Sequence, residues 1–188
     1  MTIADTFLAI QALLQPEKIV LCNDASIRIE EKAKQASMKL VEIVSVGASA
    51  FSIKYDTCGF PGRTLFGDKH NLHRGCDSVA FCEVDNEPYI LCIELKSSEP
   101  TRADVTEQFD SAHCFLDYLN TLIMHYSKTE SIKDWPRRYF VFHNQSATPL
   151  KKAGFRENFD NTAPHTAKFI PTQSGKKIYV RQLLGKPV

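Results

Sequence analysis

Two short stretches of this sequence place charged side chains directly beside strongly apolar ones. Asp77 precedes the apolar segment 78–84, and Glu94 and Lys96 end the apolar segment 89–96. A carboxylate or an ammonium at the edge of an apolar core is costly unless it is paired or bound to a metal ion. These three residues are therefore the first candidates for chemistry, and a hard divalent cation is the ligand that suits their carboxylates.

The spacing of these residues predicts that they lie close together. Side chains alternate along a strand, so Glu94 and Lys96 share one face while Leu95 points to the other. The residues 85–88 (Asp-Asn-Glu-Pro) predict a turn, which makes segments 78–84 and 89–96 a hairpin. Pairing in register then brings Asp77 near Glu94. Two carboxylates about 4 Å apart repel by roughly 4 kcal/mol at an effective dielectric near 20, so we expect them to recruit Mg²⁺ or Mn²⁺.

This pattern resembles the PD-(D/E)XK nuclease superfamily, which has the restriction-endonuclease-like fold. In that family a helix with an acidic residue is followed by a hairpin carrying Asp and Glu-X-Lys, then by a second helix and another strand. The resemblance covers about residues 26–143 and departs from the family at Cys76, where Pro is common. It implies an α/β fold with a central mixed β-sheet flanked by helices. It also implies a metal-dependent phosphodiesterase, most often a DNA endonuclease of restriction, anti-phage defence or recombination.

The resemblance assigns roles to the residues of the motif. Asp77, Glu94 and the backbone carbonyl of Leu95 would hold one or two Mg²⁺ or Mn²⁺ ions. Lys96 would orient or help to deprotonate the attacking water and would contact the scissile phosphate. An alternative is that Glu94 and Lys96 form only a surface ion pair on an exposed strand.

The segment from Ser26 to Val44 is predicted to be the first helix of the family, because its apolar residues recur at helical spacing. Glu30 falls on the apolar stripe, so we expect it to face inward, and the resemblance makes it the residue that completes the metal site. The neighbouring Glu31 lies on the polar side and is the reserve choice. The alternative is that Glu30 only complements the dipole at the start of a helix.

A second helix is predicted from about Arg102 to Met124, with Thr101 or Asp104 as its cap. Its buried stripe consists of Val105, Phe109, Ala112, Leu116, Leu119 and Ile123. Gln108 borders this stripe, and in the resembled family a polar residue on this helix touches the active site or the substrate backbone. Gln108 is therefore a candidate for substrate binding, with a satisfied glutamine on the helix flank as the alternative.

Three further residues near the motif are candidates for contact with phosphate. Ser98 follows Lys96 by two residues, although a serine there can equally cap the next helix. His73 and Arg74 immediately precede the metal-binding strand and would flank its cleft. A different use of the same region is a tetrahedral zinc site formed by Cys58, His70, His73 and Cys76, although no familiar paired spacing is present.

The rest of the chain fits one compact domain, residues 1–188, because 188 residues that are 43% hydrophobic can bury one substantial core. Residues 3–14 predict an amphipathic helix, and residues 45–55 and 138–143 predict strands. A C-terminal β-hairpin is predicted at about 167–182, with its turn at 173–176.

The composition indicates the expected setting and partners. No apolar run approaches the roughly 20 residues of a membrane helix, and the six cysteines contain no CxxC pair, so we expect a soluble, cytoplasmic protein with reduced thiols. The formal net charge of +1 argues mildly against tight nonspecific binding to nucleic acid. We expect a nucleic-acid partner, DNA before RNA, and a homodimer or a partner subunit is compatible with it. Two alternatives are a catalytically silent binding or assembly subunit and an effector nuclease activated by a partner chain.

Overall fold

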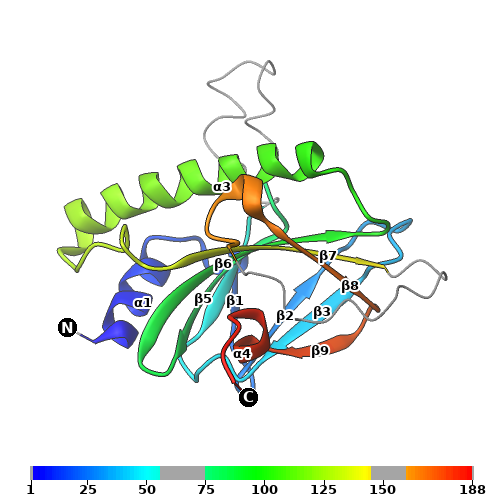
Figure 1. Cartoon of the computed structure of the whole chain (residues 1–188). Coiled ribbons are helices and arrows are strands. Elements are labelled where there is room, and N and C mark those ends of the chain that lie inside the picture. Colours follow the sequence, from blue (N-terminus) through cyan, green and yellow to red (C-terminus); the bar gives the residue numbers. More distant parts are fainter. Residues whose placement is uncertain (1, 56–74, 145–159, 188) are drawn as a thin grey trace.

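The structure is a computed structural model that describes residues 2–55, 75–144 and 160–187. Two β-sheets form the centre of the molecule, and helices pack against them (Figure 1). The larger sheet is mixed, with six strands in the order β1-β4-β5-β6-β7-β8, and the smaller sheet has the order β2-β3-β9. The expected α/β fold, with a central mixed sheet flanked by helices, is confirmed.

The strands of the larger sheet are antiparallel from β1 to β6 and parallel from β6 to β8. Their bounds are β1 Ile19–Leu21, β4 Phe51–Lys54, β5 Ser78–Val84, β6 Glu87–Lys96, β7 Arg137–Asn144 and β8 Lys168–Thr172. In the smaller sheet β2 and β3 are antiparallel, and β3 and β9 are parallel. The bounds of these strands are β2 Ser26–Glu30, β3 Leu40–Val44 and β9 Lys176–Tyr179.

The hairpin of β5 and β6 forms as the sequence predicts. Its turn residues Asp85 and Asn86 have φ values of 58° and 61°, the left-handed conformation that two-residue hairpin turns need and that Asp and Asn tolerate. Ser78 lies opposite Ile93, which sets Asp77 beside Glu94 at the end of the pairing. Both strands are almost continuously buried because the sheet is covered on both faces.

The helix α3 (Arg102–Leu122) connects β6 to β7, and this crossover allows the two strands to run parallel. Thr101 is its N-cap and forms a capping box with Asp104. All six residues of the predicted stripe are buried. Figure 1 shows α3 running along one face of the larger sheet, with the smaller sheet on the other side. The hydrophobic core is accordingly in two layers, one on each face of the larger sheet.

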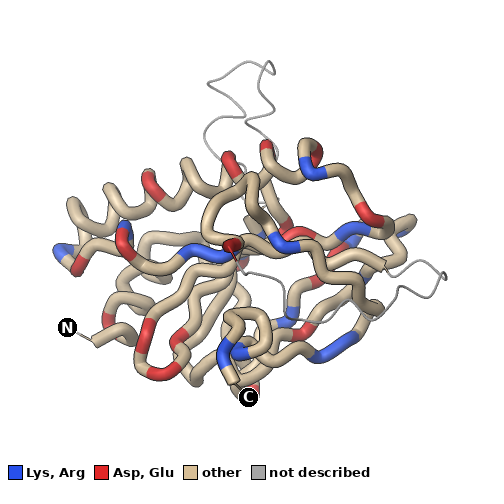
Figure 2. Tube along the Cα trace, in the orientation of Figure 1, with Lys and Arg blue, Asp and Glu red and all other residues tan. Residues whose placement is uncertain are grey.

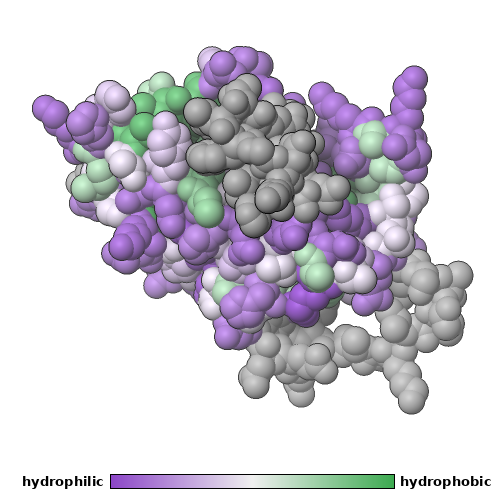
Figure 3. Space-filling model, turned by 90° about the horizontal axis from the view of Figure 1, so that it is seen from above, coloured by the Kyte–Doolittle hydropathy of each residue, from purple (hydrophilic) through white to green (hydrophobic). Residues whose placement is uncertain are grey.

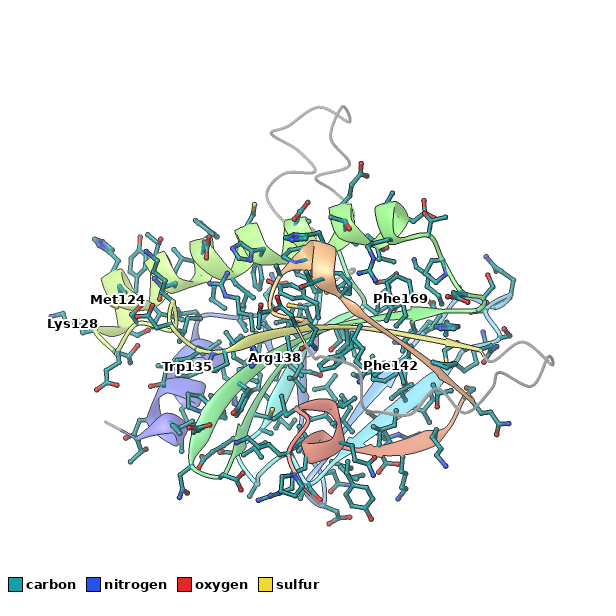
Figure 4. All side chains as sticks on the ribbon, viewed as in Figure 1. Met124, Lys128, Trp135, Arg138, Phe142 and Phe169 are labelled. Atoms are coloured by element: carbon teal, nitrogen blue, oxygen red, sulfur yellow. The ribbon has the colours of Figure 1, made fainter. Side chains whose placement is uncertain are left out.

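The remaining helices are short. Their bounds are α1 Ile3–Ala12, the 3₁₀ turns η1 Pro16–Lys18 and η4 Pro164–Thr166, the π-helical turn η3 Ile123–Ser127, and α4 Val180–Leu183. The predicted N-terminal helix is therefore confirmed as α1, and it packs on the same face as α3. Trp135 lies beside α1 (Figure 4), with its ring 5.8 Å from that of Phe7. No helix in these described ranges is long and apolar enough to cross a membrane.

The predicted helix over residues 26–44 is wrong, because this segment forms the antiparallel strands β2 and β3. In β2 the side chains alternate, with Ile27 and Ile29 buried and Arg28 and Glu30 exposed. Such alternation has the period of a strand with one buried face. The packing of this apolar face into the core outweighs the helical spacing that the whole segment also shows.

The predicted C-terminal hairpin is also wrong, because β8 and β9 belong to different sheets. The turn between them is bonded to the start of β3. The Gly175 N–H donates to the Leu40 carbonyl at 2.7 Å, and the Ser174 hydroxyl accepts from the Lys39 N–H at 2.9 Å. Gly175 has a φ of +83°, which favours glycine there. These contacts lead the chain alongside β3 instead of back along β8.

Candidate functional site

The carboxylates of Asp77 and Glu94 lie at the end of the β5–β6 hairpin. Each carboxylate accepts a hydrogen bond from a backbone N–H at or beside the other residue. The Asp77 N–H donates to Glu94 Oε2 at 3.1 Å, and the Leu95 N–H donates to Asp77 Oδ2 at 2.6 Å. The prediction that Asp77 lies near Glu94 is thus confirmed. Because each side chain is held by a backbone amide, the relative position of the two acids is fixed by the hairpin itself.

Two side chains from different elements converge on the other oxygen of Glu94. Lys96 Nζ lies 2.5 Å from Glu94 Oε1, and the Gln108 side-chain amide donates to the same oxygen at 2.9 Å. Gln108 also donates to the Gly75 carbonyl at 3.3 Å, so it links α3 to the start of the hairpin. The prediction that Glu94 and Lys96 share a face is confirmed, and Gln108 lies in the same cluster.

The burial of the acid and the base differs strongly. Glu94 is 2% exposed, whereas the Lys96 side chain is 30% exposed. The Glu94–Lys96 pair therefore does not lie on an exposed strand, as the surface ion-pair alternative required. Burial raises the pKa of Glu94 above its usual range, and the contacts with Lys96, Gln108 and the Asp77 amide oppose this shift without cancelling it.

The raised pKa of Glu94 predicts the pH dependence of a Glu94→Gln variant in metal-free buffer. The native state holds the Glu94 proton more tightly than the unfolded chain does. The contribution of this proton to the free energy of unfolding is therefore complete below the unfolded carboxyl pKa of about 4.3. It is lost as the pH rises through the raised native pKa. A glutamine does not titrate, so the variant does not lose this stabilisation as the pH rises. We therefore expect its free energy of unfolding to exceed that of the wild type at pH 7.5, with a smaller difference at pH 4.5. Urea denaturation at both pH values measures this.

Glu87→Gln is the matched control for this prediction. The Tyr89 hydroxyl and then Lys186 lower the pKa of the exposed Glu87, so its contribution is present above the unfolded pKa and lost as the pH falls. The control is expected to change stability in the opposite direction at neutral pH. A Glu94→Gln variant less stable than the wild type at pH 7.5 would show that the carboxylate's contacts outweigh its burial.

Glu30 does not join the two carboxylates as predicted. It is on β2 instead of a helix, its side chain is 50% exposed, and it pairs with Arg28 at 3.7 Å. Its expected inward orientation is therefore wrong, because Glu30 occupies the outward positions of the strand's alternation. The reserve residue, Glu31, accepts a hydrogen bond from the Ala33 N–H at 2.6 Å. Glu30 and Glu31 both line a cavity that Asp77 also borders.

The other candidate residues are placed only in part. Ser98 is exposed in the bend that follows β6. His73 and Arg74 lie outside the described residues, and so do three of the four residues of the alternative zinc site, namely Cys58, His70 and His73. Its fourth residue, Cys76, is fully buried, and burial raises the pKa of its thiol.

The donor set of the cluster suits a magnesium ion. Within the described ranges, no group of three or more His, Cys, Asp or Glu side chains is arranged to hold a metal. Mg²⁺ does not need such a group, since it commonly keeps several waters and binds one or two carboxylates together with substrate phosphate. Asp77 and Glu94 provide two carboxylates on neighbouring strands, and the Leu95 carbonyl is the third donor that we expect.

The sequence did not reveal a cavity of about 450 Å³ beside this cluster, between β2 and the β4–β5 part of the larger sheet. Lys54 and Ser78 lie on its wall next to Asp77. Lys54 is opposite Ser78 in the β4–β5 pairing, although 24 positions separate them in the chain. The proximity of Lys54 and Ser78 follows only from the register of these two strands, and no short sequence motif indicates it.

Comparison with known proteins gives no relative for this chain. No family model matches it, and no curated protein and no solved structure matches it either. A functional proposal for Asp77, Glu94 and Lys96 therefore depends on their own contacts and chemistry.

Proposed function

We propose that this protein is a divalent-metal-dependent nuclease that hydrolyses phosphodiester bonds in DNA. The observation that carries the proposal is the pair of carboxylates, Asp77 and Glu94, held together by backbone amides with Lys96 in contact with Glu94. Two adjacent carboxylates and a partly exposed ammonium are the groups that metal-assisted phosphoryl chemistry uses.

The order of the elements around this cluster supports membership of the PD-(D/E)XK superfamily. The hairpin β5–β6 carries Asp77 at its entrance and the Glu-X-Lys sequence at its exit, and α3 and the parallel strand β7 follow. This is the order that the resemblance implies from the hairpin onward. The helix with an acidic residue has no counterpart in residues 26–44, so the proposed site depends on the hairpin and α3.

In the proposed mechanism, Asp77, Glu94 and the Leu95 carbonyl hold the cation. When bound, Mg²⁺ or Mn²⁺ would lower the pKa of a water molecule and offset negative charge on the phosphoryl group. Lys96 favours the ionised form of the buried Glu94, and its exposed part can orient the attacking water and contact the scissile phosphate. Gln108 fixes the rotation of the Glu94 carboxylate through Oε1.

The distribution of charge indicates the side from which DNA approaches. Figure 2 shows acidic residues spaced along α3, and Figure 3 shows that the described surface seen from above is mostly hydrophilic, apart from a hydrophobic patch at its upper left. The acidic side chains of α3 are Asp104, Glu107, Asp110 and Asp117. Basic residues outnumber acidic ones on and beside the smaller sheet, with Arg28, Lys32, Lys34, Lys39, Lys176 and Lys177 against Glu30, Glu31 and Glu42. Since phosphates are repelled by carboxylates, we propose that the DNA backbone lies toward the smaller sheet.

A second candidate function is a partner-activated effector nuclease or a catalytically silent subunit of the same fold. The observation that favours it is that both Glu94 oxygens accept contacts from within the protein. A partner chain that displaced Lys96 or added a third acidic ligand would convert this closed arrangement into a metal site.

The proposed function is tested with the purified wild-type chain on supercoiled DNA, single-stranded DNA and RNA, each with Mg²⁺, Mn²⁺ or EDTA. We expect DNA cleavage with either metal and none with EDTA, because the two carboxylates act through the ion. Calorimetry with Mn²⁺ gives binding separately. Metal binding without cleavage would support the partner-activated effector, and neither binding nor cleavage would favour the silent subunit.

A further inference from the structure

The cavity beside Asp77 has the size of a site for one small ligand. Its volume of about 450 Å³ lies within the usual range of roughly 300–1,000 Å³ for ligand pockets. Val20 and Ile29 form apolar parts of its wall, and Ile29 is 3% exposed. Apolar walls with a few convergent polar groups are typical of sites that bind a planar organic group.

An unpartnered hydroxyl in the cavity wall points to a missing ligand. Ser78 is 3% exposed, and its Oγ finds no hydrogen-bond partner in the described part of the chain. A buried hydroxyl without a partner costs free energy, and native proteins retain such groups mainly where function needs them. Ser78 also lines the cavity, but its Oγ has almost no accessible surface, so a ligand supplies the missing partner by a rotation of the Ser78 side chain toward it.

Lys54 lies opposite Ser78 on the neighbouring strand β4. The two residues are directly opposite in the antiparallel pairing, so their side chains lie on the same face of the sheet, with Cβ atoms about 5 Å apart. Lys54 also lines the cavity. A hydroxyl and an ammonium side by side can together recognise carbonyl oxygens and ring nitrogens of a ligand.

The charges around the cavity are mixed instead of uniformly basic. Its described wall carries four basic and four acidic side chains, including the Arg28–Glu30 pair. A simple anion is not favoured by such a wall, because the carboxylates repel it. A nucleobase suits it better, since a base presents both acceptors and amino donors on one edge and has two apolar faces.

We propose that this cavity binds one unpaired nucleotide of the substrate strand, with the edge of its base against Ser78 and Lys54 and its faces against Val20 and Ile29. The proposal rests on the proposed nuclease function and adds a base-reading site to it. Asp77 borders both the cavity and the carboxylate cluster, so it would lie between this nucleotide and the phosphate that the cluster acts on. An unpaired base is required because a paired base is stacked inside the duplex.

The test measures binding of the four deoxynucleoside monophosphates, and separately of inorganic phosphate, to the full chain in EDTA by calorimetry, so that cleavage plays no part. We expect at least one nucleotide to bind. Ser78→Ala should weaken its binding by about 3- to 10-fold and Lys54→Met by about 10-fold or more. The melting temperature of Ser78→Ala without ligand should equal or exceed that of the wild type, because the variant loses an unpaired buried hydroxyl.

The matched controls are Ser49→Ala and Lys133→Met, which alter an exposed serine and an exposed lysine outside the cavity lining and should leave binding unchanged. The proposal is overturned if no nucleotide binds, if phosphate alone binds as tightly as a nucleotide, or if the cavity variants bind like the controls. DNA cleavage without nucleotide binding would overturn the cavity proposal and leave the nuclease intact. Nucleotide binding without metal-dependent cleavage would support the cavity and count against the nuclease.

Discussion

Replacing Lys96 with Ala is expected to lower the rate of Mg²⁺-dependent DNA cleavage by about 10²- to 10⁴-fold, the range for losing a general acid–base or charge-stabilising group. The Lys96 ammonium contacts Glu94 Oε1 and is the partly exposed cation of the cluster. Its removal leaves a buried carboxylate without this partner, which favours the protonated form of Glu94. Both the orientation of water at the phosphate and the charge of a metal ligand are then impaired. Single-turnover cleavage of supercoiled DNA measures the loss.

Two comparisons isolate the role of Lys96 from a general loss of structure. Lys96→Arg keeps the positive charge but changes its shape and donors, so it should retain more activity than Lys96→Ala and less than the wild type. Lys133→Ala removes an exposed lysine and should cleave at the wild-type rate. If Lys96→Ala cleaves as fast as Lys133→Ala, Lys96 has no part in catalysis.

The hairpin that carries the motif was predictable because its signals are local. An Asp-Asn turn between two apolar runs sets the register, and the register alone brings Asp77 to Glu94. Residue alternation then gives the shared face of Glu94 and Lys96. Gln108 could be predicted as a site candidate for a similar reason, since the helical period of α3 places it at the edge of the buried stripe.

The segment that contains Glu30 was mispredicted because two periods coexist in it. Its apolar residues fit a helical stripe over the whole segment, while Ile27 and Ile29, and again Val41 and Ile43, fit short strands. The decision between these periods comes from tertiary packing on the larger sheet, which no short stretch of sequence contains. The position of the C-terminal turn was predicted correctly, but the strands that it joins do not pair with each other. The hydrogen bonds of the turn are instead to the distant Lys39 and Leu40.

Replacing Phe109 with Ala is expected to lower the free energy of unfolding by about 3–5 kcal/mol, the usual range for truncating a buried phenylalanine. Phe109 is on the buried side of α3 and is fully buried. Its ring packs edge to face against that of Tyr139 on β7, with centroids 5.4 Å apart. It follows Gln108 directly in the helix. Loss of its packing should therefore also loosen the Gln108 contact with Glu94 and reduce cleavage in the variant that remains folded.

Urea denaturation of Phe109→Ala beside Asp110→Ala measures this effect. Asp110 is the next residue on the exposed side of α3, and its truncation should change stability by no more than about 0.5 kcal/mol. Phe109→Leu keeps most of the apolar volume and should cost less than about 1.5 kcal/mol. A loss below about 1 kcal/mol in Phe109→Ala would mean that α3 is not anchored through this ring. If Phe109→Ala loses stability but keeps full cleavage at a temperature where it is folded, Gln108 does not need a fixed position for Glu94 to function.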